Sequence, residues 1–170
     1  MSGERFKIIL IFLVVFCLHR TASAESARAL VNQANKLYTQ GKFNDAINKY
    51  EQAITENPDL QEPKFNKANS YYRLDDLENA TGAYEEVAAK SKNMKLVAKA
   101  KYNLGNSYFQ RGSRQKDSDL QKAIDDFKTS IGFWRSVLDI EPHNEKAAKN
   151  IEVARLVIKD LLDQLNKQKQ

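Results

Sequence analysis

Apolar residues recur at intervals of three and four along most of the chain, which is the period of an amphipathic helix. One such stripe consists of Leu120, Ile124, Phe127 and Ile131. The chain has only 6 Gly and 3 Pro in 170 residues, fewer turn residues than sheet-rich folds need. The pattern therefore predicts an all-α fold with seven helices, at about 26–40, 43–56, 61–73, 77–90, 93–111, 118–140 and 144–167.

A second periodicity, of 34 residues, relates the first two helix pairs. When Gly41 is aligned with Asp75, residues of the same type coincide on both sides. The matched positions are Ala34 with Ala68, Leu37-Tyr38 with Tyr71-Tyr72, Phe43 with Leu77, Ala46 with Ala80, and Tyr50 with Tyr84. A third unit follows with a small shift, marked by Gly105, Tyr108, Gly112, Ala123 and Phe127. One helix pair cannot bury its own apolar face, so we expect the pairs to stack.

The segment from Ala27 to Leu60 resembles a tetratricopeptide repeat (TPR) unit, with Gly41 at its turn and Pro58 near its end. The resemblance implies a right-handed α-solenoid of about three TPR helix hairpins plus a C-terminal capping helix. The domain would cover 25–167, with repeats at about 27–60, 61–94 and 98–142, a cap at 144–167 and a disordered tail at 168–170. We expect Gly41 to end the first helix with a positive φ, and Pro58 to stop the second.

The third unit is larger than the other two. A polar segment follows Gly112 and predicts an extra loop at 113–118, and the next helix is longer by about two turns than its counterpart in the first unit. Phe133 and Trp134 lie in this extension. Two interpretations remain open: the two aromatic side chains pack in the core of the longer helix, or they form an exposed anchor for a partner.

The last predicted helix has more apolar residues than one buried stripe requires. The apolar residues of this helix are Ile151, Val153, Ala154, Leu156, Val157, Ile158, Leu161, Leu162 and Leu165. Either the helix only caps the stack, or part of its surface contacts a partner or a second copy of the chain.

A further pattern joins the third unit to this helix. It consists of Tyr102-Asn103-Leu104-Gly105-Asn106, Phe133-Trp134 with Leu138, Pro142, and Ala147-Ala148-Lys149-Asn150-Ile151-Glu152. The pattern is similar to that of TPR proteins of the bacterial Bat (aerotolerance) group. The resemblance implies a place in or facing the periplasm, and partners that include von Willebrand factor A-domain membrane proteins and a MoxR-type ATPase.

The first 24 residues follow a different pattern. Arg5 and Lys7 precede an unbroken apolar run at 8–18, and Ala22-Ser23-Ala24 follows it. This order is typical of a secretory signal peptide, and the run is shorter than the roughly 20 residues of a membrane span. We predict cleavage after Ala24 and secretion across the inner membrane into the periplasm. An uncleaved signal would instead anchor the chain in the membrane.

Removing this segment changes the inventory of reactive groups. Three basic residues and one acid leave with it, so the net charge falls from +5 to +3, which gives no support to nucleic-acid binding. The only Cys, Cys17, also leaves, and one His, His143, remains. We expect no metal site and no cofactor. The adjacent acids Asp75-Asp76, Glu85-Glu86 and Asp125-Asp126 point in different directions and are interpreted as solvated, so no enzyme activity is expected.

Asparagine is the most regular polar feature. One row comprises Asn32, Asn66, Asn103 and Asn150, and a second row three residues later comprises Asn35, Asn69 and Asn106. A spacing of three places both rows on one helical face, which in TPR stacks lines the concave groove. Because Asn both donates and accepts hydrogen bonds, these residues are candidates for binding an extended peptide. The alternative is that they only solvate the groove or link neighbouring helices.

A sharper hypothesis compares the chain with carboxylate-clamp TPRs, which bind the C-terminal carboxylate of a chaperone. Asn35, Asn66 and Lys99 match that pattern, whereas Val31 and Asn103 stand where it has Lys and Arg. Much of the charge that holds a carboxylate is therefore missing. The leading hypothesis is a non-catalytic adaptor that binds a protein or peptide in its groove, with Lys99 among the groove residues. The alternative is a structural protein that self-associates through the cap helix or the extended third hairpin.

Overall fold

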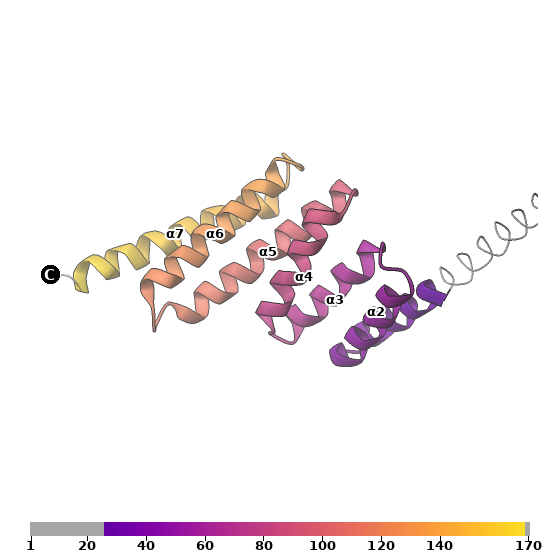
Figure 1. Cartoon of the computed structure of the whole chain (residues 1–170). Coiled ribbons are helices and arrows are strands. Elements are labelled where there is room, and N and C mark those ends of the chain that lie inside the picture. Colours follow the sequence, from indigo (N-terminus) through magenta and orange to yellow (C-terminus); the bar gives the residue numbers. More distant parts are fainter. Residues whose placement is uncertain (1–25, 169–170) are drawn as a thin grey trace, which may run out of the picture. The chain divides into compact units, whose positions relative to one another are not determined.

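The computed structural model describes residues 26–168, so the predicted signal peptide at 1–24 lies outside the described residues. Within them the chain forms seven helical segments and no strand, as predicted (Figure 1). The first helical segment covers residues 26–39. It is followed by α2 (Phe43–Glu56), α3 (Gln61–Arg73), α4 (Leu77–Lys90), α5 (Met94–Gln115), α6 (Leu120–Leu138) and α7 (Glu145–Gln168).

The described residues divide into two compact units, 26–70 and 71–168, and the boundary falls in the last turn of α3. In the first unit, the helical residues 26–39 and α2 form a hairpin around the buried side chains of Ala34, Ala46 and Tyr50. The two alanines let the helices approach closely, because they carry no atoms beyond Cβ. Next to the turn, the rings of Tyr38 and Phe43 meet edge to face, with centroids 5.3 Å apart.

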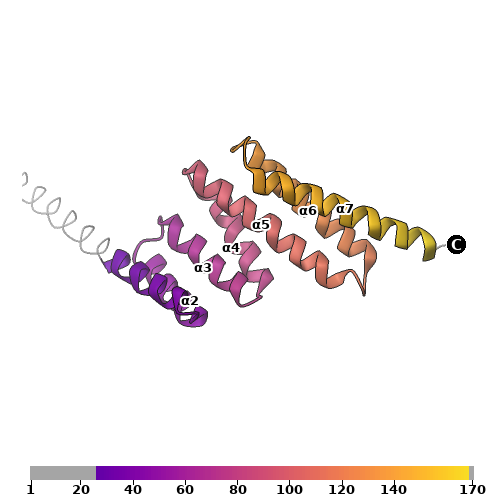
Figure 2. The ribbon, with the colours of Figure 1, turned by 180° about the vertical axis from the view of Figure 1, so that it is seen from behind.

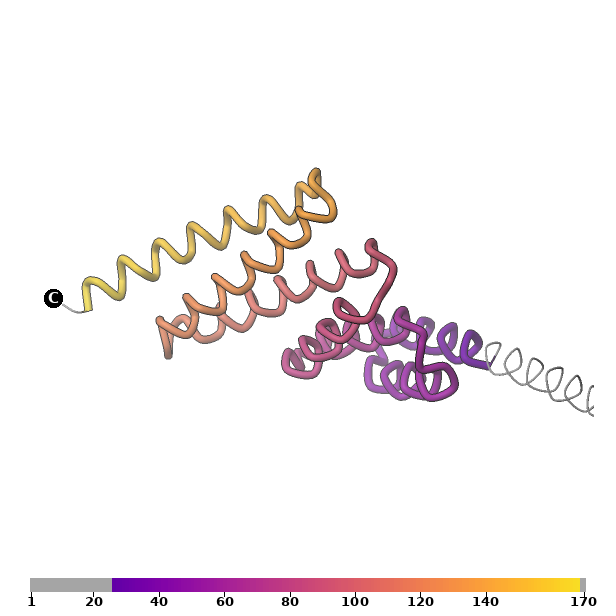
Figure 3. The backbone as a smooth tube through the Cα atoms, turned by 45° about the horizontal axis from the view of Figure 1, so that its top comes forward, coloured from indigo at the N-terminus to yellow at the C-terminus, as the bar shows by residue number. Residues whose placement is uncertain are grey.

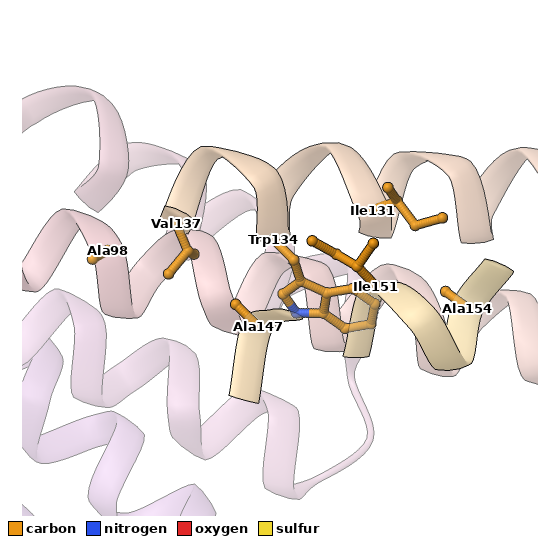
Figure 4. Close-up of a cluster of buried hydrophobic side chains, with 7 residues drawn as sticks. All are labelled: Ala98, Ile131, Trp134, Val137, Ala147, Ile151 and Ala154. Atoms are coloured by element: carbon orange, nitrogen blue, oxygen red, sulfur yellow. The ribbon is translucent and has the colours of Figure 1, made fainter. Parts of the chain in front are cut away.

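The second unit contains the four helices α4 to α7, each packed against the next (Figures 2 and 3). Its core centres on Trp134 of α6, which is 2% exposed. Ala147, Ile151 and Ala154 of α7 belong to the same buried cluster (Figure 4). This cluster joins α6 to α7.

The first two predicted turns have the same backbone conformation. Gly41 has a φ of 75° and Asp75, at the equivalent position, has a φ of 69°. This left-handed conformation favours Gly, and Asp is among the other residues that tolerate it. After the second turn, the Asp76 carboxylate accepts a hydrogen bond from the backbone N–H of Asn79, which caps α4. The predicted positive φ at Gly41 is confirmed.

The third turn differs from the prediction. Helix α5 continues through Gly112 to Gln115, so the predicted loop at 113–118 is wrong and only residues 116–119 connect α5 to α6. Gly112 is needed for close packing rather than for a turn, because a Cβ there would lie 3.0 Å from the carbonyl oxygen of Ala123. The extra polar residues thus lengthen α5 to 22 residues, beside the 19 residues of α6.

Helix α7 begins and ends one residue later than predicted and packs on α6 through one apolar stripe. Three other large apolar side chains on α7 are exposed: Val153 (42%), Leu156 (69%) and Leu162 (40%). Across residues 26–168, no helix has the combination of length and apolar character that crossing a membrane requires.

Candidate functional site: two asparagine-lined pockets

The first unit has a small pocket beside a pair of asparagines. Asn66 of α3 donates a hydrogen bond from Nδ2 to Oδ1 of Asn35, on the helical residues 26–39, over 3.2 Å. The Tyr50 hydroxyl donates to the same oxygen over 2.6 Å. The adjoining cavity has a volume of about 170 Å³ and is lined by Asn35, Tyr38, Thr39, Tyr50, Asn66 and Asn69.

The buried phenol of Tyr50 orients the amide of Asn35. Burial, with a smaller contribution from nearby Tyr38, raises the pKa of Tyr50 to about 12. The hydroxyl therefore keeps its proton at neutral pH and acts as a donor. Because Oδ1 of Asn35 accepts from both Tyr50 and Asn66, the Asn35 amide nitrogen is the group left to donate to a ligand.

The second unit has a larger pocket beside a second pair of asparagines. Asn150 of α7 donates from Nδ2 toward Oδ1 of Asn106 on α5 over 3.4 Å, and to the Tyr102 hydroxyl over 3.2 Å. The cavity has a volume of about 350 Å³. It is lined by Tyr72, Asn106, Phe109, Gln110, Ser113, Trp134, Asn150 and Val153.

Aromatic side chains form the apolar part of this pocket. The Phe109 ring lies 5.8 Å from the Trp134 ring and meets Phe127 edge to face at 5.0 Å. The indole is fixed because Nε1 of Trp134 donates to the Tyr102 carbonyl oxygen over 3.2 Å. Gly105 makes room for it, since a Cβ at that position would lie 2.6 Å from Cδ1 of Trp134.

The burial of Trp134 rules out the interpretation that this side chain is an exposed anchor for a partner. An anchor must project into solvent, whereas Trp134 is almost fully buried and contributes only to the lining of the pocket. Phe133 is partly buried and stacks on the Tyr108 ring at 5.4 Å. Helix α6 places adjacent residues on different faces, which is why the two side chains have different surroundings.

Charges at the edge of the second pocket are paired with one another. Gln110 donates to Oδ1 of Asp75 over 2.7 Å, and Asp75 also forms an ion pair with Arg114. Tyr72 has a raised pKa, caused first by burial and then by Tyr102, while Arg114 acts in the opposite direction. The Tyr72 hydroxyl is therefore neutral at physiological pH, and it can donate or accept a hydrogen bond.

Asp126 was predicted to lie on a solvated face, and the structure shows that this prediction is wrong. Asp126 is 6% exposed and accepts two hydrogen bonds from Arg111, over 2.8 Å to Nε and 2.6 Å to the terminal nitrogen. These hydrogen bonds are the main cause of the raised pKa of Arg111, whose guanidinium also lies 4.3 Å from the Tyr108 ring centroid. The pair ties α5 to α6.

The residues predicted to line the groove divide into four groups. Asn35, Asn66 and Asn69 line the first pocket, and Asn106 and Asn150 line the second. Asn103 donates to the Tyr84 hydroxyl over 3.2 Å and so links α5 to α4. Asn32 and Lys99 are exposed and line neither pocket.

Sequence reasoning missed the aromatic residues of both pockets except Trp134, which it named only as a possible exposed anchor. A signal was present, because Tyr38 and Tyr72 are separated by one 34-residue period and each lines a pocket. Phe109 gave no such signal, since an aromatic residue on an apolar stripe is indistinguishable from an ordinary core residue. No cluster of three or more metal-binding side chains occurs in the part of the chain that the structure describes.

Two family models match the chain, one described as a TPR repeat over residues 34–75 and one described as a tetratricopeptide repeat over residues 65–130. No protein of curated function matches its sequence. Among solved structures, the N-terminal domain of stress-induced protein-1 (STI-1) from C. elegans is similar, with 22% identity and a TM-score of 0.64. That match covers 79% of this chain and 98% of the other.

Two further similar structures contain a bound peptide. The first TPR of Spaghetti (RPAP3), bound to the HSP90 peptide SRMEEVD, is 20% identical with a TM-score of 0.57, and the match covers 80% of this chain and 98% of that one. The second TPR domain of human RPAP3, in complex with the HSP70 peptide SGPTIEEVD, is 16% identical with a TM-score of 0.54 and the same coverage. At these identities the likeness shows the fold, and the predicted all-α fold of TPR type is confirmed.

Proposed function

Because this chain carries tetratricopeptide repeats, we propose that it is a non-catalytic interaction module that binds a peptide segment of another protein in its asparagine-lined pockets. The repeat supplies the framework and the pockets supply the recognition. Similar TPR structures hold short peptides of HSP90 and HSP70, which supports peptide binding as the mode of recognition.

The recurrence of one arrangement in both units carries this proposal. In each unit, an Asn on the first helix of one hairpin forms a hydrogen bond with an Asn on the next first helix, beside a pocket. The pairs are Asn35 with Asn66 and Asn106 with Asn150. Each amide has two donor hydrogens and an acceptor oxygen, so one mutual hydrogen bond leaves groups that match the N–H and C=O of a peptide backbone.

The location of the module is a second part of the proposal. The order of basic, apolar and small residues in 1–24 supports export to the periplasm. The resemblance of the third unit to Bat-group TPR proteins directs the search for a partner to von Willebrand factor A-domain membrane proteins. A fusion of residues 1–30 to a reporter that is active only outside the inner membrane tests the export, and an inactive reporter rules it out.

A peptide selection tests the binding function. The protein is used to select binders from a library of random peptides, and the affinity of a selected peptide is measured by calorimetry. Replacing both Asn106 and Asn150 with Ala is expected to weaken the binding of a peptide held in the second pocket by about thirtyfold, since two lost hydrogen bonds contribute about 1 kcal/mol each. The same holds for Asn35 and Asn66 in the first pocket.

The control is Asn48→Ala, which removes an exposed amide of α2 that lines neither pocket. It should leave the affinity unchanged. A selection that yields no binder, or binders indifferent to both Asn pairs, contradicts the proposal. Circular dichroism of each variant separates loss of binding from loss of the helical fold.

Self-association is a second candidate function, favoured by the exposed apolar side chains of α7. Leu156 is 69% exposed, and Val153 and Leu162 lie on the same helix. If two copies join through the face of α7 that carries Leu156, the mass in sedimentation rises with concentration, and Leu156→Asp returns it to that of a monomer. A constant monomer mass at high concentration excludes this function.

A further inference from the structure

The pocket of the second unit differs in chemistry from a carboxylate-binding site. None of the residues that line it carries a charge. Its apolar part consists of Phe109 and the edge of Trp134, with Val153 at the entrance on α7. Its polar part consists of amide and hydroxyl groups, so the pocket offers hydrogen bonds but no net charge to a ligand.

The nearest charges do not change this property. Arg114 lies close enough to influence the pKa of Tyr72, yet it is paired with Asp75, whose carboxylate also accepts from Gln110. An incoming carboxylate would therefore meet a cation that is already neutralised, beside an acid that repels it. Lys99, the one cation of α5 that matches the clamp pattern, is exposed and outside the lining.

The cavity has room for a large side chain. Its volume of about 350 Å³ is in the range of sites that enclose a small ligand. An aromatic ring placed there would meet Phe109 and Trp134, and aromatic pairs stabilise contact beyond the apolar area that they bury. Asn106 and Asn150 at the same site remain able to bind the peptide backbone on either side of that ring.

We propose that the pocket between α5 and α7 selects an uncharged peptide segment by one aromatic or large aliphatic side chain, and does not recognise a terminal carboxylate. This inference rests on the peptide-binding function proposed above and specifies its ligand. The acidic peptides in the similar RPAP3 structures are thus expected to be poor ligands of this pocket.

Trp134 is the only Trp of the chain, so its indole N–H gives one signal that reports on the pocket. The probes are three peptides, added to the ¹⁵N-labelled protein and followed by two-dimensional NMR. The first is a pentapeptide of Gly and Ser with a central Phe, capped at both ends. The second has Ala in place of Phe, and the third is SRMEEVD with a free carboxylate.

We expect the Phe peptide to shift the Trp134 signal in a saturable way. The Ala peptide should bind about tenfold more weakly or worse, because burying a large apolar side chain contributes on this order. The SRMEEVD peptide should leave the signal in place at the same concentrations. Equal binding of the Phe and Ala peptides overturns the inference, and so does a shift by SRMEEVD that Lys99→Glu abolishes.

Two variants of α7 form a matched pair. Val153→Asp places a carboxylate at the entrance, and filling the pocket then requires partial desolvation of that charge. This variant should weaken the binding of the Phe peptide by about tenfold. Leu156→Asp makes the same change three residues later, outside the lining, and should have no effect. Equal effects of the two variants contradict the assignment of the ligand to this pocket.

The failure of this inference differs from the failure of the proposed function. If library-selected peptides bind and depend only on Asn35 and Asn66, the second pocket is not the site and the inference is wrong, although the protein still binds peptides. If no library peptide binds at all, the proposed function itself is wrong.

Discussion

The two pockets share a pair of asparagines but differ in what lies beneath it. In the first unit, the Tyr50 hydroxyl of α2 donates to the asparagine pair, and the cavity is about 170 Å³. In the second unit, the Tyr102 hydroxyl accepts from Asn150, and Trp134 and Phe109 line a cavity of about 350 Å³. The repeat therefore provides the amide groups, whereas α5 and α6 provide the aromatic surface of the larger pocket. This difference assigns hydrogen bonding to both sites and room for a large apolar side chain to one.

The largest effect on stability is expected at Gly105, because the second pocket requires a residue without a side chain at this position. Gly105→Val would place atoms on the Trp134 ring, which its hydrogen bond to Tyr102 holds in position. We expect a loss of about 3 kcal/mol in the free energy of unfolding, the upper end for overpacked cores. Denaturant unfolding followed by circular dichroism measures it.

Gly82→Ala is the matched control, since a Cβ there meets nothing within 4 Å on α4. It should stabilise the helix by up to about 1 kcal/mol. If Gly105→Val unfolds at the same denaturant concentration as the wild type, Trp134 is free to move and the pocket is not fixed in the way described.

The second effect concerns the ion pair that joins α5 to α6. Arg111→Ala leaves the buried Asp126 carboxylate without its two hydrogen bonds. Removing one partner of a fully buried pair costs about 3–5 kcal/mol, but the Arg111 side chain is 38% exposed, so we expect about 2 kcal/mol. Adding Asp126→Asn to Arg111→Ala should restore part of this loss, and a further loss instead would contradict the pairing.

The third effect is a pH dependence of stability that arises from Tyr50 at the first pocket. Tyr50→Phe removes a hydrogen bond to Asn35 and should cost about 1 kcal/mol at neutral pH. The folded protein raises the pKa of Tyr50 from 10.0 to about 12, so it favours the protonated phenol. Below pH 10 the phenol is protonated in the folded and the unfolded chain alike. As the pH rises from 10 toward 12, it ionises first in the unfolded chain, so the free energy of unfolding falls by up to about 1.4 kcal/mol per pH unit.

Hydrogen exchange and unfolding at pH 10 and 11 measure that loss. The wild type should lose stability relative to Tyr50→Phe over this range, because the variant has no phenol to ionise at this position. Parallel pH profiles for the two proteins would show that Tyr50 is not held in its protonated form by the fold.

Most of the helical framework followed from periodicity alone. The bounds of α2, α3 and α4 were predicted without error, because short turns at Gly41 and Asp75 mark them clearly. The end of α5 was misplaced because Gly112 was interpreted as a turn residue, whereas its small size serves the contact with α6. Gly has two distinct uses, conformational freedom and close approach, and a sequence pattern does not separate them.

The candidate sites were predicted less completely. The asparagines could be found because polar residues repeat visibly on an otherwise apolar helix. Phe109 could not be separated from the core, and Trp134 was named only as a possible exposed anchor, since only the packing shows which ring borders a cavity. The burial of Asp126 was also hidden, because its partner Arg111 lies on a different helix.

The smallest effect compares the two asparagine pairs directly. Asn150→Ala removes hydrogen bonds to Tyr102 and Asn106 at a partly buried site, and should cost about 1 kcal/mol. Asn66→Ala removes one hydrogen bond to Asn35, which is exposed and retains the bond from Tyr50. Water can replace the lost partner there, so we expect under about 0.5 kcal/mol. Hydrogen exchange, which reports each unit separately, should show faster opening of α5 and α7 in the first variant and little change of α3 in the second. The reverse order would mean that the pair in the first unit, rather than the pair in the second unit, is the stronger link between neighbouring helices.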